Sequence, residues 1–212
     1  MKGSGVFFVV CMLSVAAACR NEAGHDGFLI GRAGEIDGLH APWDGLDDNT
    51  SFRCFADSSF FYFLYEVEDS TMTFSDDFPE ERVVDTEDRV EIFFSPGPDM
   101  ERYYCAEIDP LGRVMDYSCE YYARMDYGWD FTTLSAAGWL TSEGYAVAGR
   151  ISLDELKSLG IEPHAGFHMG IFRADFHPDG TVNWYSHVET DDTAPDFHRP
   201  EMLFYTETGT LD

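Results

Sequence analysis

The sequence predicts an all-β domain, an antiparallel β-sandwich of the immunoglobulin or jelly-roll kind with one short helix. Two observations favour this class. Short segments with alternating apolar and polar residues recur along the chain, with turn residues between them. Only one segment has the spacing and capping residues of a helix. No long linker, repeat or low-complexity tract interrupts residues 34–212, so these residues are expected to form one domain.

The first clear strand is "SFFYFLYEVED", residues 59–69. Its alternation places Phe61, Phe63, Tyr65 and Val67 on one face, which is expected to face the core. Further strands are expected at residues 89–95, 103–109, 113–122, 144–152, 165–176 and 202–208.

The strand "RVEIFFS" (residues 89–95) directs Val90 and Ile92 to the core and Arg89 and Glu91 to the opposite face. A hairpin follows, in which "DPLG" (residues 109–112) has the proline and glycine that a tight turn requires.

The predicted helix is "SLDELKSLG", residues 152–160. Ser152 is a suitable N-cap, and Glu155 three residues later completes the pattern of a capping box. Leu153 and Leu156 form a narrow apolar stripe, and Gly160 ends the helix.

The net charge of −27 excludes nucleic acid as a partner, because phosphates require basic side chains. It also argues against docking on anionic lipid by charge alone. Aromatic residues make up 16% of the chain, which indicates that the acidic residues cover a folded domain. Neutral ligands and divalent cations are the expected partners.

Residues 1–18 have the pattern of an export signal, with one lysine followed by an apolar run that is too short to span a membrane. "VAAAC" resembles a bacterial lipobox, which predicts a lipidated Cys19, a tether over residues 19–33 and an outer-membrane or cell-surface lipoprotein. Cleavage at an A-x-A site, giving a soluble exported protein, is the alternative.

Cys54, Cys105 and Cys119 remain after the signal and the lipidated cysteine, and their spacing fits no zinc motif. Cys105 and Cys119 flank the predicted hairpin, so they either pair or remain buried free thiols. His164 and His168 have helical spacing in a strand-like segment, which does not favour a metal or haem site there.

Acidic residues are so abundant that a catalytic pair cannot be singled out, and no nucleophile or phosphate-binding motif is present. The stretch from Glu66 to Asp88 is rich in oxygen ligands and could hold Ca²⁺ or simply solvate a long loop. Its candidate ligands are Asp69, Asp76, Asp77, Asp85 and Asp88.

Two tryptophans are predicted to lie in polar loops. Trp184 stands in "DGTVNWYSHVETDD" beside Asn183 and His187, and Trp129 stands in "RMDYGWDFTT". Such a ring either stacks on the flat apolar face of a sugar or covers the edge of the sandwich.

Six segments together resemble the family 9 carbohydrate-binding modules: "IDGLHAPW", "FYFLYEVED", "DRVEIFFSP", "YYCAEIDPLGRVMDY", "GYAVAGRISLDELKSLGI" and "FHRPEMLF". The likeness covers nearly all of the chain after the tether, and the hairpin is its most specific part. Tyr145 and Ala148 depart from it, because the family has Trp and Glu there.

The resemblance implies non-catalytic binding of plant-type polysaccharides such as xylan, or of their ends, with calcium in a structural role and no cofactor required for binding. Trp184 and Trp129 would stack on the sugar. Hydrogen bonds would come from Asn183, Arg89, His187 or Arg173. The alternatives are a structural or interaction lipoprotein of a glycan-handling complex and a glycoside hydrolase with paired carboxylates.

Overall fold

The computed structural model describes residues 35–43 and 45–208 of the 212-residue chain. The predicted export signal, Cys19, the tether and Gly34 lie outside the described residues. Among the residues that are described, no helix has the length and apolar character needed to cross a membrane.

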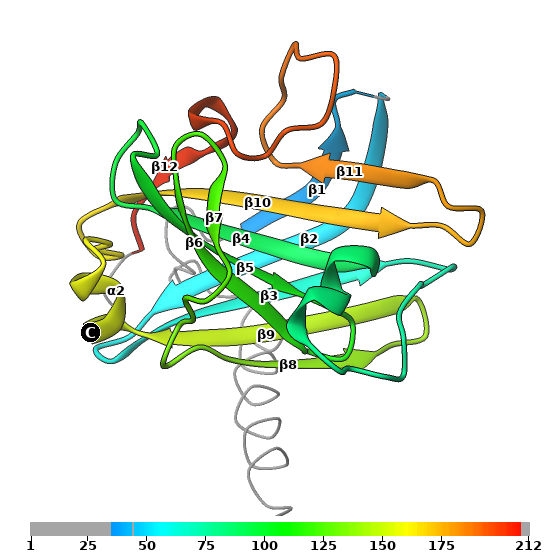
Figure 1. The fold of residues 1–212 in the computed structure, drawn as a ribbon, viewed down its shortest axis with the longest axis horizontal. Coiled ribbons are helices and arrows are strands. Elements are labelled where there is room, and N and C mark those ends of the chain that lie inside the picture. Colours follow the sequence, from blue (N-terminus) through cyan, green and yellow to red (C-terminus); the bar gives the residue numbers. More distant parts are fainter. Residues whose placement is uncertain (1–34, 44, 209–212) are drawn as a thin grey trace, which may run out of the picture.

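The described chain is built mainly from antiparallel strands (Figure 1). The strands are β1 (Glu35–Ala41), β2 (Leu46–Ala56), β3 (Phe60–Glu68), β4 (Arg89–Ser95), β5 (Arg102–Ile108), β6 (Val114–Glu120), β7 (Arg124–Asp126), β8 (Ser135–Leu140), β9 (Gly144–Ser152), β10 (Phe167–Phe176), β11 (Val182–Ser186) and β12 (Phe204–Thr206). The short helices are η1 (Glu81–Thr86), α2 (Leu153–Ser158) and η2 (Pro200–Met202).

All twelve strands of the described chain join one sheet in the order β7-β6-β5-β4-β10-β11-β1-β2-β3-β9-β8, with β12 paired to β10. The sheet curls so that the half around β4, β5 and β10 packs on the half around β2, β3 and β9 (Figure 1). The predicted all-β antiparallel sandwich with one short helix is confirmed, and its two layers are halves of one continuous sheet.

The main core lies between these halves and follows the predicted alternation. Phe61, Phe63, Tyr65 and Val67 of β3 are all buried in it. Tyr65 also donates a 2.7 Å hydrogen bond from its hydroxyl to the Glu91 carbonyl of β4, so one side chain links the two halves. Burying aromatic rings on both layers supplies most of the hydrophobic stabilisation of such a fold.

A second core covers the outer face of β4, β5, β6 and β10. Phe93 of β4 and Phe172 of β10 contribute to it, with ring centroids 5.0 Å apart. Phe197 and Met202 from the C-terminal segment cover them. This outer face is therefore protected from water, although the sequence pattern alone indicates a solvated face.

The local predictions for the hairpin and the helix are confirmed in most details. The turn at Asp109 ends with Gly112 at a φ of 80°, which favours glycine. Ser152 accepts hydrogen bonds from the backbone N–H of Asp154 and Glu155 and so caps α2. The Glu155 carboxylate does not close the capping box, because it accepts hydrogen bonds from Thr132 and Thr133 instead.

Candidate functional site

A cavity of about 340 Å³ opens on the outer face of the half that contains β4, β5, β6 and β11. Charged side chains and aromatic rings line it together, which suits a ligand that has both polar groups and apolar surfaces. The charged lining residues are Asp85, Arg89, Glu91, Glu107 and Asp196; the aromatic ones are Tyr117, Tyr127, Trp184 and Phe197; Met125, Pro195 and His198 complete the wall.

A buried arginine and two buried glutamates form one side of this cavity. Arg89 Nε lies 2.9 Å from Glu91 Oε1 and 2.5 Å from Glu107 Oε2. Glu91 and Glu107 face each other across β4 and β5. The Tyr117 hydroxyl donates a 2.6 Å hydrogen bond to Glu107 Oε1. The guanidinium also donates to the carbonyl oxygens of η1, at 3.3 Å from Val84, and is thereby fixed in place.

Burial and, to a smaller extent, the negative charge of Glu107 raise the pKa of Glu91 to about 8, although Arg89 opposes the shift. The site therefore favours the protonated form of the Glu91 carboxyl more than water does. A protonated Glu91 can donate a hydrogen bond, whereas the Glu107 carboxylate can only accept them. The cavity thus offers donors and an acceptor side by side.

Trp184 lies on strand β11 and not in the predicted loop. Ala174 of β10 pairs with both Trp184 and Arg89, so the three residues form one row across the sheet. Because alanine has no long side chain, the guanidinium carbon of Arg89 reaches 5.4 Å from the indole centroid. Phe197 supports the ring from another side, at 5.7 Å between ring centroids.

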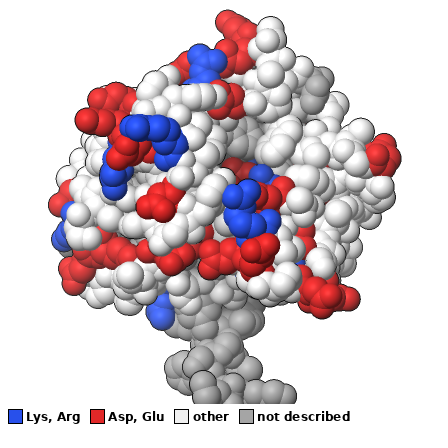
Figure 2. All heavy atoms as spheres, viewed as in Figure 1, with Lys and Arg blue, Asp and Glu red and all other residues white. Residues whose placement is uncertain are grey.

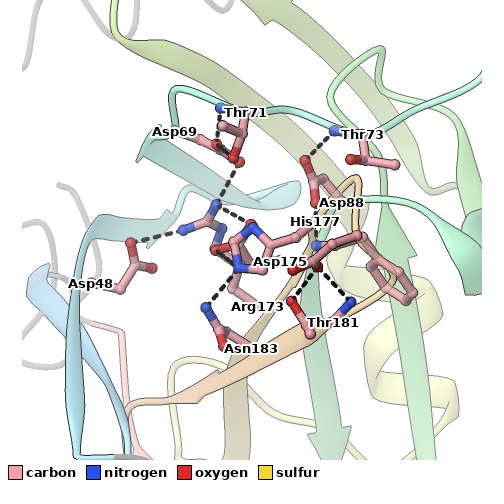
Figure 3. Close-up of polar contacts among 12 residues, drawn as sticks. Asp48, Asp69, Thr71, Thr73, Asp88, Arg173, Asp175, His177, Thr181 and Asn183 are labelled. Atoms are coloured by element: carbon pink, nitrogen blue, oxygen red, sulfur yellow. Dashed lines mark hydrogen bonds and ion pairs between the residues drawn. The ribbon is translucent and has the colours of Figure 1, made fainter.

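The structure brings Trp184 and Arg89 together, but Asn183 and Arg173 lie on the opposite face of the same strands. Successive residues of a strand point to opposite faces, and Asn183 is the neighbour of Trp184. Arg173 of β10 is 2% exposed and makes ion pairs with Asp48 (2.8 Å) and Asp69 (2.7 Å), as Figure 3 shows.

The remaining two sugar-binding candidates lie outside the cavity lining. His187 follows β11, and its ring centroid is 5.0 Å from that of Phe204. Trp129 lies in a loop, as predicted, with its ring 4.9 Å from Tyr104 and 4.8 Å from Phe131. Trp129 therefore packs against the main core on the other side of β5 from the cavity.

Of the predicted calcium ligands, Asp69 and Asp88 come together, and Asp175 joins them. One carboxylate oxygen from each of the three lies within 4.8 Å of the others. Burial is the main cause that raises the pKa of Asp88 to about 7; hydrogen bonds from the backbone N–H of Thr73 and Phe176 oppose the shift, and Asp69 and Asp175 add to it.

The remaining calcium candidates lie elsewhere. Asp76 and Asp77 are exposed, and Asp85 pairs with Arg82 in η1. On the face of the molecule in Figure 2, acidic side chains spread over the surface and the basic ones lie among them.

The buried cluster in Figure 3 has an excess of negative charge. The side chains of Asp48, Asp69 and Asp175 are almost fully buried, as is Asp88, and Arg173 can balance only one of the four. Oxygen donors in such an arrangement fit the chemistry of Ca²⁺.

Sequence reasoning did not find Glu107, Tyr117, Tyr127, Phe197 and His198 as parts of the site. Glu107 and Tyr117 share the outer face of the sheet with Arg89, and strict alternation along three strands could have indicated this. The last two residues lie far along the chain and reach the cavity by long-range packing, which no local pattern signals.

Comparison with known proteins identifies the family. The model for the carbohydrate family 9 binding domain-like family matches residues 37–202. The chain belongs to this family. No curated protein matches the chain.

Solved structures of similar fold include other family 9 modules. A proposed carbohydrate-binding protein from Bacteroides uniformis matches with a TM-score of 0.59 and 16% identity, over 81% of this chain and 85% of that one. A family 9 module from Caldicellulosiruptor kristjanssonii matches in its complex with glucose (TM-score 0.50, 17% identity, 77% and 78% coverage). It also matches in its complex with cellotriose (TM-score 0.51, 16% identity, 77% and 76% coverage).

Membership in this carbohydrate-binding family is consistent with an acidic domain whose cavity combines a tryptophan with buried polar groups.

Proposed function

We propose that this family 9 domain binds the end of a plant-type oligosaccharide or polysaccharide, without cleaving it, in the cavity beside Trp184. The observation that carries the proposal is the combination of an indole ring with Arg89, Glu91 and Glu107 in one cavity. The volume of about 340 Å³ is at the lower end of the range of small-molecule sites, which favours one or two sugar rings over a long chain segment.

In this binding mode the roles of the side chains follow from their chemistry. Trp184 offers an apolar ring on which the C–H face of a sugar can stack. Arg89 and protonated Glu91 donate hydrogen bonds to hydroxyl oxygens, and Glu107 accepts them. Because these groups are held by one another before the ligand arrives, binding costs little ordering of side chains. A neutral sugar also adds no charge to a protein of net charge −27.

Isothermal titration with glucose, cellotriose and xylotriose tests the proposal. We expect binding of at least one of these sugars by the wild type, with an affinity about fivefold lower for Trp184→Ala, because loss of ring stacking costs about 1 kcal/mol. Trp129→Ala is the matched control and should keep its affinity. Absence of heat at millimolar concentrations of all three sugars, or equal losses in both variants, would contradict the proposal. Release of new reducing ends would indicate a hydrolase instead.

We infer that Ca²⁺ binds to Asp69, Asp88 and Asp175 and neutralises the charge of this cluster. Three carboxyl groups around one guanidinium, with Asp88 beside two of them, support the inference. Addition of Ca²⁺ to chelator-treated protein should raise the melting temperature, and a concentration 100 times the dissociation constant stabilises by about 2.7 kcal/mol. Asp88→Asn should weaken this response, whereas Asp76→Asn should not. An unchanged melting temperature at millimolar Ca²⁺ argues against the site.

We also propose that a lipid on Cys19 holds the domain at the outer membrane or the cell surface, where an extracellular polysaccharide is accessible. The lipobox-like "VAAAC" supports this proposal. Mass spectrometry of the N-terminal peptide tests it, and Cys19→Ala should release the protein from the membrane fraction. An unmodified Arg20 or Cys19 at the mature N-terminus argues against the anchor.

A further inference from the structure

Two cysteines and a histidine meet in the second core, directly beneath the wall of the cavity. Cys105 belongs to β5, Cys119 to β6, and His198 to the C-terminal segment that covers both strands. One ligand atom from each residue lies within 4.8 Å of the other two. We propose that Cys105, Cys119 and His198 form a binding site for a thiophilic metal ion of the zinc class.

The strand register suits an ion between the sulfurs better than a disulfide. Cys105 pairs with Tyr117, and Cys119 pairs with Tyr103, so the cysteines occupy diagonal positions on neighbouring strands. Diagonal residues are about 7–8 Å apart, beyond the Cα separation that a disulfide normally tolerates. A tetrahedral zinc ion holds two thiolates at roughly 3.8 Å, which spans the diagonal with less movement of the strands. Both cysteines are free thiols in the structure.

The histidine is held in place on several sides. The Tyr103 hydroxyl lies 2.9 Å from His198 Nδ1. The backbone N–H of His198 donates to the Asp196 carboxylate at 3.1 Å, and the ring packs 5.1 Å from that of Phe93. A partner on one ring nitrogen orients the imidazole and fixes which nitrogen is left for an ion, as in known metal sites.

The charge of the proposed ligands matches that of a divalent ion. Cys105 and Cys119 are 0% and 1% exposed. Two thiolates and a neutral imidazole carry a charge of −2, which a divalent ion neutralises without leaving a buried charge. Each thiol gives up its proton to solvent as its sulfur binds the ion.

A fourth position remains open for a small ligand. The cluster contains three His, Cys, Asp or Glu residues among those that the structure describes. His198 also lines the cavity, so a water molecule or a hydroxyl group from the cavity side could complete a tetrahedron. The proposed ion would thus support the wall that carries Asp196 and His198. This inference does not depend on sugar binding.

Titration of the reduced, chelator-treated protein with Co²⁺ and then Zn²⁺ tests the site. We expect one equivalent of Co²⁺ to give the thiolate charge-transfer band in the near ultraviolet and the visible bands of a tetrahedral centre, both removed by Zn²⁺. Cys119→Ser and His198→Gln should each weaken Zn²⁺ binding at least tenfold. Cys54→Ser is the matched control, since Cys54 is equally buried but lies in the main core. It should leave the bands unchanged.

Alkylation of the wild-type protein provides a second measurement that does not require the variants to fold. Bound Zn²⁺ should slow modification of Cys105 and Cys119 at least tenfold and leave Cys54 unaffected. The proposal is overturned if Co²⁺ gives no thiolate band and Zn²⁺ gives no protection. Mass spectrometry of the untreated protein provides a third outcome. A Cys105–Cys119 disulfide, seen as a mass lower by two hydrogens both with and without chelator, also overturns the proposal.

Discussion

Removal of the Arg89 guanidinium should destabilise the fold strongly at alkaline pH and less in acid. Arg89, Glu91 and Glu107 are 5%, 2% and 4% exposed, so Arg89→Met leaves two buried carboxyls without their cation. Breaking a buried ion pair by removing one partner costs about 3–5 kcal/mol. We expect this loss in the free energy of unfolding at pH 8, measured by urea denaturation. At pH 5 the loss should be at least about 1.4 kcal/mol smaller, because a carboxyl left unpaired can be protonated there.

The control for this prediction is an ion pair on the surface. Arg102 and Glu120 are 52% and 43% exposed in their side chains, and Arg102→Met should cost less than about 1 kcal/mol. Glu107→Gln in the Arg89→Met background should recover part of the lost free energy of unfolding at pH 8, because it removes a buried negative charge that has no partner. A loss below about 1 kcal/mol for Arg89→Met, or an equal loss at both pH values, would refute the reasoning.

Three further predictions concern pH and local packing. Burial raises the pKa of Glu91 to about 8 and of Asp116 to about 7, so their stabilising contribution is complete below about pH 4 and is lost as pH rises towards 8. Between pH 5 and 7 the free energy of unfolding should fall by about 1.4 kcal/mol per pH unit for each such group, measured by urea denaturation; a flat profile would contradict this. Gly149→Ala should cost about 1–3 kcal/mol in thermal unfolding, because an added Cβ would lie 2.1 Å from the Phe63 ring; full stability would contradict the packing. Ser152→Ala should cost about 1 kcal/mol through loss of the N-cap of α2, and restoration by Ser152→Asp checks the cause.

The faces of the strands could be predicted from the sequence, because alternation is a local property. Val90 and Ile92 enter the main core as expected, and Arg89 and Glu91 point to the other face. Their burial could not be predicted, since it depends on covering residues such as Phe197, about a hundred positions later in the chain. An outward-facing charge on an antiparallel strand is usually solvated, and only the tertiary structure reveals the exception.

The site residues were harder to predict for two physical reasons. Trp184 lies among polar residues that resemble a loop, yet β11 forms there because it pairs with β10 along five residue pairs. Tertiary pairing of this kind overrides a weak local preference. The family resemblance predicts that Asn183 and Arg173 act together with Trp184. The period of two in a strand separates them, because neighbours such as Asn183 and Trp184 point to opposite faces.

The alternation of side chains along a strand also places two charged networks on opposite faces of the sheet at the start of β4. Asp88 points inward and accepts backbone hydrogen bonds from Thr73 (2.6 Å) and Phe176 (2.5 Å), which hold the beginning of β4 against β10. The next residue, Arg89, points outward into the cavity. Because adjacent residues share a peptide unit, the backbone position that Asp88 fixes also sets where the Arg89 guanidinium meets Trp184. If the proposed Ca²⁺ binds at Asp88, we expect it to hold the cavity more rigidly and to raise the affinity for a sugar, measured by titration with and without chelator; equal affinities would contradict this coupling.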